Sequence, residues 1–155
     1  MARKIGLVLS ALLVGSTAFV LGAASASSGI AAPTAITVLE HATHDTIVDV
    51  GAKGDSTGDI FTFHNAIYDS TDVTNVGKDS GMCIRESPKA GTWECVWTTV
   101  LPDGSITAEG PFSDTAPSDT YAVTGGTGLY ENVRGSLVET VNAAGEYVLA
   151  FSLIP

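Results

Sequence analysis

Two polar side chains fall on faces that are otherwise apolar in the expected strands. In residues 36–40 the alternation of side chains places Glu40 with the apolar set, and in residues 59–68 it does the same for Asn65. An inward carboxylate is costly unless it is paired or used, and such groups gather at functional sites. We predict Glu40 and Asn65 as catalytic residues. Glu40 would stabilise developing positive charge, and Asn65 would hold a substrate oxygen or a water.

Each of these residues also has a plainer interpretation. Glu40 could be a rim carboxylate in water, or the partner of a buried Arg85. Asn65 could be a satisfied core amide that braces a turn.

Aromatic residues share the same inward faces. They are most simply core side chains, because a barrel interior must be filled. The sharper interpretation makes them walls of a ligand pocket, since pockets are mostly apolar with few polar groups. The predicted wall residues are Phe61, Phe63, Trp93 and Trp97.

The two cysteines are predicted to form a disulfide. In a hairpin centred on Lys89, Cys83 and Cys95 lie opposite each other. An even cysteine pair in an exported chain is typically oxidised. A catalytic thiol is not expected without a neighbouring histidine.

The sequence gives no sign of a metal or a cofactor. His41 and His44 would point to opposite faces of a strand, so they could not easily share an ion. The glycine-rich residues 124–128 lack the Lys-Ser/Thr of a phosphate loop and are predicted to form a tight turn. We therefore expect no metal site and no cofactor.

The elements that must position these residues are short strands, and no helix is expected. Alternating runs rich in β-branched and aromatic residues are separated by turn residues. Seven or eight strands at this spacing indicate a barrel or a sandwich. The expected strands cover residues 36–40, 59–68, 82–86, 92–100, 105–109, 120–123, 135–142 and 146–154.

The first 26 residues are predicted to be a signal peptide. Arg3 and Lys4 precede a mostly apolar run from Ile5 to Leu21, and Ala24-Ser25-Ala26 fits a cleavage site. A membrane anchor is the alternative, but the run is short for a span. We expect a flexible lead-in at 27–35, one β domain at 36–155, and secretion to the periplasm or the exterior.

The charge excludes some partners. Removing Arg3 and Lys4 leaves 7 − 2 = 5 basic residues against 17 acidic ones, a net charge of −12. Such a chain is repelled by nucleic acid and by anionic membranes. We expect a small hydrophobic molecule as the partner, with no nucleic acid and no membrane after signal cleavage.

Four segments resemble the plant allene oxide cyclases and, more loosely, the dirigent proteins. The resemblance runs from about residue 36 to 154 and implies an eight-stranded antiparallel closed barrel with a one-ended apolar cavity, often assembled as a trimer. The segments are Gly58–Tyr68, Val76–Cys83, Glu109–Phe112 and Thr124–Tyr130.

The resemblance also implies roles for single residues. The family's first-strand Glu corresponds to Glu40, its water-holding Asn to Asn65, and its cavity-wall Cys to Cys83. Other positions differ from the family pattern. Ala42 replaces a second water-binding Asn, Val48 and Asp49 occupy the positions of the family's Ser-Pro pair, and Phe112 replaces a Tyr of the cavity wall.

Together these observations predict a secreted barrel that binds a small apolar oxygenated molecule and steers its cyclisation or isomerisation. The alternative is a dirigent-like or lipocalin-like barrel that carries a hydrophobic ligand without catalysis. A filled structural barrel with no cavity is a third possibility.

Overall fold

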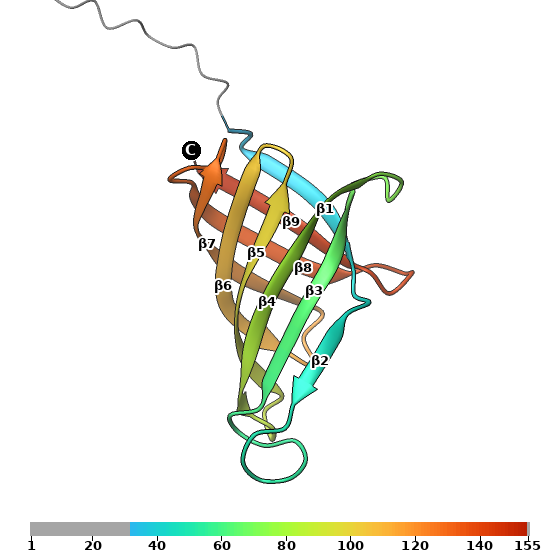
Figure 1. Ribbon diagram of the computed structural model, residues 1–155, viewed down its shortest axis with the longest axis vertical. Helices are drawn as coiled ribbons and strands as arrows, with labels where there is room; N and C mark the ends of the chain where they lie inside the picture. Colours follow the sequence, from blue (N-terminus) through green and yellow to red (C-terminus); the bar gives the residue numbers. More distant parts are fainter. Residues whose placement is uncertain (1–31, 155) are drawn as a thin grey trace, which may run out of the picture.

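The computed structural model describes residues 32–154, which form an all-β barrel (Figure 1). No helix that could cross a membrane occurs in this part of the chain. The predicted signal peptide and most of the lead-in lie outside the described residues. The strands are β1 (Ala35–His41), β2 (Asp45–Val48), β3 (Ile60–Asp69), β4 (Asn75–Ser87), β5 (Thr92–Leu101), β6 (Gly104–Ser113), β7 (Ser118–Gly128), β8 (Arg134–Val141) and β9 (Tyr147–Ile154).

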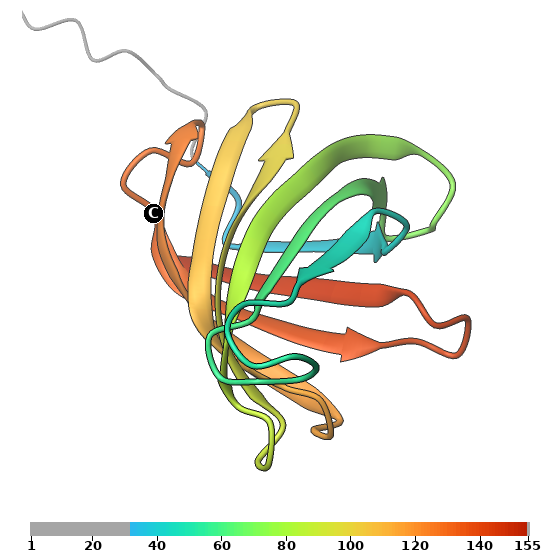
Figure 2. The ribbon, with the colours of Figure 1, turned by 60° about the horizontal axis from the view of Figure 1, so that its bottom comes forward.

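Eight of the nine strands close into an antiparallel barrel. β3 to β9 pair in sequence order, β9 pairs with β1, and β1 closes the ring on β3. The predicted eight-stranded barrel is thus confirmed. The extra strand, β2, continues the line of β1 along β3: residues 38–41 pair with the second half of β3, and residues 45–48 pair with its first half. Figure 2 shows β2 lying beside β3 with its other edge open.

Alternation along the strands sorts the interior as predicted. Inward residues of β3 and β5 point into the barrel, where they join a packed apolar core. Its members that are at most 2% exposed include Ile67, Ile106, Leu137, Leu149 and Phe151.

β4 is longer than predicted because its glycines serve close packing. Its first half, residues 75–81, has the composition of a turn yet runs as strand. At Gly81 a Cβ would lie 2.3 Å from the Cβ of Trp97 on β5. Glycine here allows the close approach of β5 at Trp97, and Asp79, two residues earlier on the same face of β4, is buried in the interior.

The predicted glycine-rich turn at residues 124–128 is wrong. These residues continue β7 across from β6, after a register shift at Thr107. At Gly126 a Cβ would lie 2.4 Å from the carbonyl oxygen of Ser105, so close strand packing explains this glycine. Only Gly128, with φ +62°, needs the conformation that the turn interpretation assumed.

The loop between β2 and β3 is organised by Asp59. This buried carboxylate accepts hydrogen bonds from the backbone N–H of Val50 at 2.8 Å and of Ser56 at 2.8 Å. These two bonds hold the pKa of Asp59 below its usual range. The loop therefore lies in a defined place at one end of the barrel, next to Arg85.

Candidate functional site

Asn65 sits where the barrel wall breaks between β1 and β2. Its Oδ1 accepts hydrogen bonds from the backbone N–H of Thr43 and of His44, both at 2.9 Å. Its Nδ2 donates to Glu40 Oε1 at 2.6 Å and to Asp45 Oδ1 at 3.0 Å. Asn65 thus braces a turn, as the plainer interpretation predicted, and it also orients the Glu40 carboxyl group. Its predicted contact with a substrate oxygen or a water stays a prediction.

Glu40 is buried in the interior, with 7% of its surface exposed. Burial raises the pKa of this carboxyl, and the hydrogen bond from Asn65 only partly opposes the rise. Arg85 is not its partner, because that guanidinium pairs with Asp55 and Asp114. Glu40 is therefore neither a rim carboxylate nor half of an ion pair.

Asp79 is a second buried carboxyl beside Glu40. It lies opposite Asn65 on β4, is fully buried, and has the Glu40 carboxyl as the neighbour with which it can share a hydrogen-bonded proton. Burial, followed by the neighbouring charge of Glu40, raises its pKa to about 9. Two carboxyl groups this close hold at least one proton between them at neutral pH.

The opposite wall carries a third acidic group. Glu139 on β8 is partly buried near Tyr121 of β7 and Tyr147 of β9. Burial raises the pKa of Glu139 to about 8, and the Tyr121 hydroxyl that faces it opposes the rise. At neutral pH the Glu139 carboxyl is therefore mostly protonated, and on the other side Glu40 and Asp79 share at least one proton; a protonated carboxyl donates hydrogen bonds and protons.

A pocket of about 50 Å³ lies between these two walls. This volume holds a few waters, whereas typical ligand pockets measure about 300–1,000 Å³. A larger ligand must therefore move the partly exposed phenylalanines of the wall. The polar lining is Glu40, Asp45, Tyr121, Glu139 and Tyr147. The remaining wall is Ala42, Phe61, Phe63, Trp97, Phe112 and the disulfide Cys83–Cys95.

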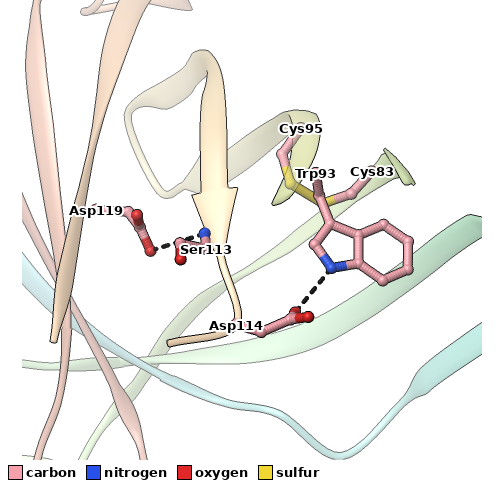
Figure 3. The surroundings of a disulfide bond; sticks show 6 residues. All are labelled: Cys83, Trp93, Cys95, Ser113, Asp114 and Asp119. Carbon is pink, nitrogen blue, oxygen red and sulfur yellow. Dashed lines mark hydrogen bonds between the residues drawn. A yellow bond between two sulfur atoms is a disulfide. The ribbon is translucent and has the colours of Figure 1, made fainter. Parts of the chain in front are cut away.

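The predicted disulfide is present and forms part of this wall (Figure 3). Cys83 and Cys95 are directly paired across β4 and β5, with their Cα atoms 4.0 Å apart. Phe61 lies opposite Cys83 on β3. The disulfide thus holds β4 and β5 together within the aromatic wall of the pocket.

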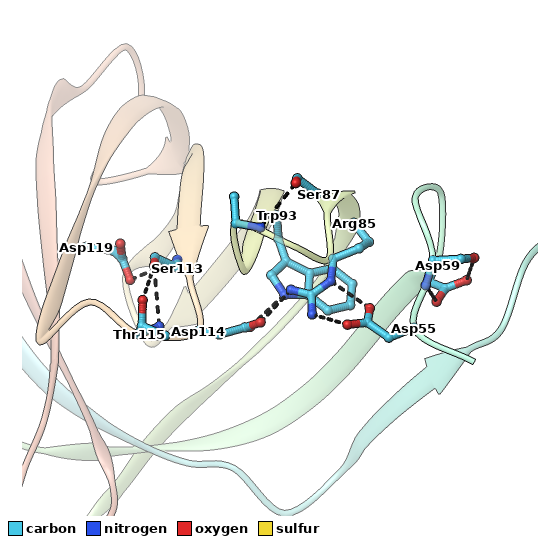
Figure 4. Close-up of polar contacts among 11 residues, drawn as sticks. Asp55, Asp59, Arg85, Ser87, Trp93, Ser113, Asp114, Thr115 and Asp119 are labelled. Carbon is cyan, nitrogen blue, oxygen red and sulfur yellow. Dashed lines mark hydrogen bonds and ion pairs between the residues drawn. The ribbon is translucent and has the colours of Figure 1, made fainter.

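Trp93 is the one predicted wall residue that lies outside the pocket. It lines a second hollow at the end of the barrel, with Arg85 and the β2–β3 loop. Arg85 stacks on its ring at 4.3 Å, and the indole Nε1 donates to Asp114 at 2.8 Å (Figure 4). Arg85 also forms a two-pronged pair with Asp55. This network links β4, β5, the β2–β3 loop and the turn after β6 around the second hollow.

One histidine and two carboxylates, His41, Asp72 and Glu146, come together where β1 meets the turns after β3 and β8. His41 Nε2 is 2.7 Å from Asp72 Oδ1 and 3.3 Å from Glu146 Oε1. Within residues 32–154 these are the groups close enough to share a metal ion. His41 and Asp72 already form a direct hydrogen bond, so these groups have each other as partners and connect β1 to two turns.

Sequence reasoning missed Asp79, Glu139 and the two tyrosines. For Glu139 a signal was present, because alternation along β8 places it on the face of buried Leu137. Asp79 carried no such signal, since its segment has the composition of a turn. The sequence thus identified one wall of the site and missed the other.

The fold and the pocket define a class of protein: a small closed antiparallel barrel with an acid-lined pocket in its interior. Residues 36–153 match the family described as "Allene oxide cyclase barrel like domain". Because the match covers most of the chain, the protein belongs to this family, as the sequence resemblance indicated.

Solved structures with the same barrel have diverse activities. A pyocyanin demethylase superposes with a TM-score of 0.69 at 29% identity, covering 77% of this chain and 99% of that one. A pterocarpan synthase dirigent protein gives 0.63 at 16%, covering 77% and 82%. An exo-specific intermolecular Diels–Alderase gives 0.62 at 20%, covering 77% and 96%. No curated protein sequence matches the chain.

Proposed function

We propose that this protein binds a small conjugated, oxygenated molecule in its acid-lined pocket and steers its cyclisation or isomerisation. The observation that carries the proposal is the buried group of Glu40, Asn65 and Asp79 at the edge of an aromatic pocket. Dirigent and Diels–Alderase barrels show that the fold itself accommodates such chemistry.

Proton donation is the chemistry that this arrangement supports. Asn65 donates to Glu40 Oε1, which leaves Oε2 as the oxygen that can carry a proton. A protonated Glu40 can donate to a substrate oxygen as a bond to that oxygen breaks. The resulting carboxylate then stabilises the positive charge on the carbon skeleton. The aromatic walls hold the flexible part of the substrate in one reactive conformer.

A second candidate reaction is demethylation of pyocyanin or of a similar molecule. The observation that favours it is the 29% identity to a pyocyanin demethylase across nearly the whole of that chain. A flat molecule of this kind suits aromatic walls, and the carboxyl groups could exchange protons with it. A barrel that only carries its ligand is the non-enzymatic alternative, while the pocket counts against a completely filled barrel.

Two substrates test these proposals. The protein is first supplied with an allene oxide generated in situ, and the enantiomeric excess of the cyclopentenone is measured. A clear excess that Glu40→Gln abolishes supports steered cyclisation, whereas a racemate equal to the protein-free control rejects this reaction. The protein is then incubated with pyocyanin, and mass spectrometry measures loss of a methyl group. Binding without conversion of either substrate would leave the carrier role.

Export and assembly are part of the same proposal. The signal-peptide pattern and the disulfide support secretion. A trimer is what the family resemblance implies, and exposed apolar side chains on the outer face of β4 and β5 would suit an interface. The native mass from light scattering decides between trimer and monomer. These side chains are Met82, Ile84 and Val96.

A further inference from the structure

The ionisable groups that line the pocket are all acids. Glu40, Asp45 and Glu139 line it, whereas no Lys, Arg or His does so among the described residues. The cation near the pocket is Arg85, and Asp55 and Asp114 already neutralise it at the end of the barrel. A carboxylate or phosphate on a ligand would therefore find no positive partner in the pocket.

The aromatic wall suits a cation. The rings of Phe61 and Phe63 lie 5.6 Å apart, and Phe63 lies 6.4 Å from Trp97. Aromatic faces attract cations within about 6 Å of the ring centre. The same kind of contact occurs in the second hollow, where Arg85 Cζ lies 4.3 Å from the centre of the Trp93 ring.

Asp79 adds a further acid directly beside Glu40. It is fully buried, and burial together with the neighbouring charge of Glu40 raises its pKa to about 9, so the two carboxyl groups share at least one proton at neutral pH. A positive charge in the pocket would favour the release of such a proton, because the interior screens charges weakly.

We propose that the pocket selects an aromatic ligand with a positively charged ring nitrogen and rejects carboxylate and phosphate ligands. This inference rests on the proposed function, in which the pocket is the substrate site. It narrows the substrate class from oxygenated conjugated molecules in general to cationic nitrogen heteroaromatics.

Such selection predicts that binding is coupled to proton release. Burial raises the pKa of Glu139 to about 8, so this carboxyl is mostly neutral at pH 7. A bound cation stabilises its ionised form, and the proton leaves to the buffer. Cation affinity should therefore rise as pH increases from 6 to 8, while affinity for a neutral hydrogen-bond acceptor should not rise. The other titratable groups that face Glu139 are Glu40, Asp45, Asp79, Asp119, Tyr121 and Tyr147.

The test compares three two-ring probes that differ in charge. N-methylquinolinium is the cation, 1-methylnaphthalene the neutral isostere and 1-naphthoate the anion. Binding is measured by titration calorimetry from pH 6 to 8, in two buffers with different ionisation enthalpies to count released protons. We expect the cation to bind at least tenfold more tightly than the neutral probe at pH 8, with proton release, and the anion not to bind.

Variants separate the pocket from the overall charge of the chain. Glu139→Gln should abolish proton release and most of the cation's advantage, whereas Glu94→Gln on the outer face of β5 removes the same charge and should change neither. Equal binding of the cation and the neutral probe, or binding of the anion, would overturn the inference and leave the pocket as a substrate site. Failure of all three probes to bind would reject both the selection of cations and the use of this pocket as a substrate site.

Discussion

Asn65 and Glu40 are separated by 25 positions in sequence, yet Asn65 Nδ2 donates to Glu40 Oε1 at 2.6 Å inside the barrel. The same amide accepts the two backbone N–H groups that the strand break leaves free. One side chain thus connects the break in the wall to the acid of the pocket. The break brings Ala42 and Asp45 to the pocket lining. Asn65 therefore affects both the local backbone structure and the chemistry of the site.

Replacing Glu40 with Gln should remove activity and preserve the fold. Glutamine keeps the size of the side chain and an oxygen that accepts from Asn65, but it cannot donate an acid proton. Loss of a general acid typically lowers the rate by about 10²–10⁴-fold. We expect this loss in kcat on the substrate found above, with an unchanged melting temperature. Activity within twofold of wild type would eliminate the acid role.

Replacing Asn65 with Ala should lower stability as well as activity. The change leaves the N–H groups of Thr43 and His44 without their acceptor and removes the donor to Glu40. Unsatisfied polar groups cost about 1–3 kcal/mol each when buried, and less where water reaches them. Urea unfolding should show a loss of about 2–3 kcal/mol. A stability equal to that of Glu40→Gln would mean that the break does not depend on the amide.

Stability should decline between about pH 4 and pH 9. Burial raises the pKa of Asp79 from 3.8 to about 9 and that of Glu139 from 4.5 to about 8, so the folded state binds these protons more tightly than the unfolded state. This stabilisation is complete at acid pH and is lost as pH rises through the folded-state values. Urea unfolding at pH 5, 7 and 9 measures it.

The variant Asp79→Asn isolates the contribution of this residue. It cannot ionise, so its unfolding free energy should fall less between pH 5 and 9 than that of the wild type. Asp55, Asp59 and Asp69 have lowered pKa values and act only at acid pH, where they favour folding as pH rises to about 4. Parallel curves for the variant and the wild type above pH 5 would contradict the assignment.

Removing the disulfide should destabilise the barrel and loosen the pocket wall. The bridge closes a loop with a sequence separation of 12, for which chain entropy gives about 3 kcal/mol. The double variant Cys83→Ala/Cys95→Ala should lose this amount in urea unfolding. Reductant should destabilise the wild type and not the variant. Insensitivity of the wild type to reductant under unfolding conditions would show that the bridge is absent in solution.

Replacing Asp114 with Asn should cost more than a surface substitution of the same kind. Asp114 accepts hydrogen bonds from buried Arg85 at 2.6 Å and from Trp93 at 2.8 Å, so the change removes the charge that both donors face. We expect a loss of about 1.5–3 kcal/mol, typical of hydrogen bonds to a charged group. Asp103→Asn in an exposed turn serves as the control. Equal effects would mean that solvent screens the network.

The sequence predicted the parts of this molecule in which local pattern and packing agree. Strict alternation in β3 and β5 identified the inward aromatics, and the symmetry of the hairpin around Lys89 identified the opposed cysteines. It could not reveal that Asp79 lies in a strand, because the glycines of β4 are required by the close approach of β5, Gly77 at Val100 and Gly81 at Trp97. That requirement exists only once the sheet has formed.

The same limit applies to residues 124–128 and to β2. The glycines of β7 have the composition of a turn, and Gly126 is explained by its contacts with Ser105 of β6 and with Tyr130. β2 has only four residues and is defined by its pairing with β3. Trp93 alternates with Cys95 and Trp97, so no local pattern could place it beyond the pocket with Arg85. These errors arise where partners distant in sequence decide the structure.

The free edge of β2 bears on how the protein stays dispersed. Its outer side is unpaired in the described sheet, and Ile47 on it is 62% exposed. Open strand edges recruit further strands and start aggregates unless they are short or charged. β2 is four residues long, begins with Asp45 and is followed by Asp49, so it is both short and charged. Asp45 lines the pocket and also adds charge to this open sheet edge, where it opposes self-association.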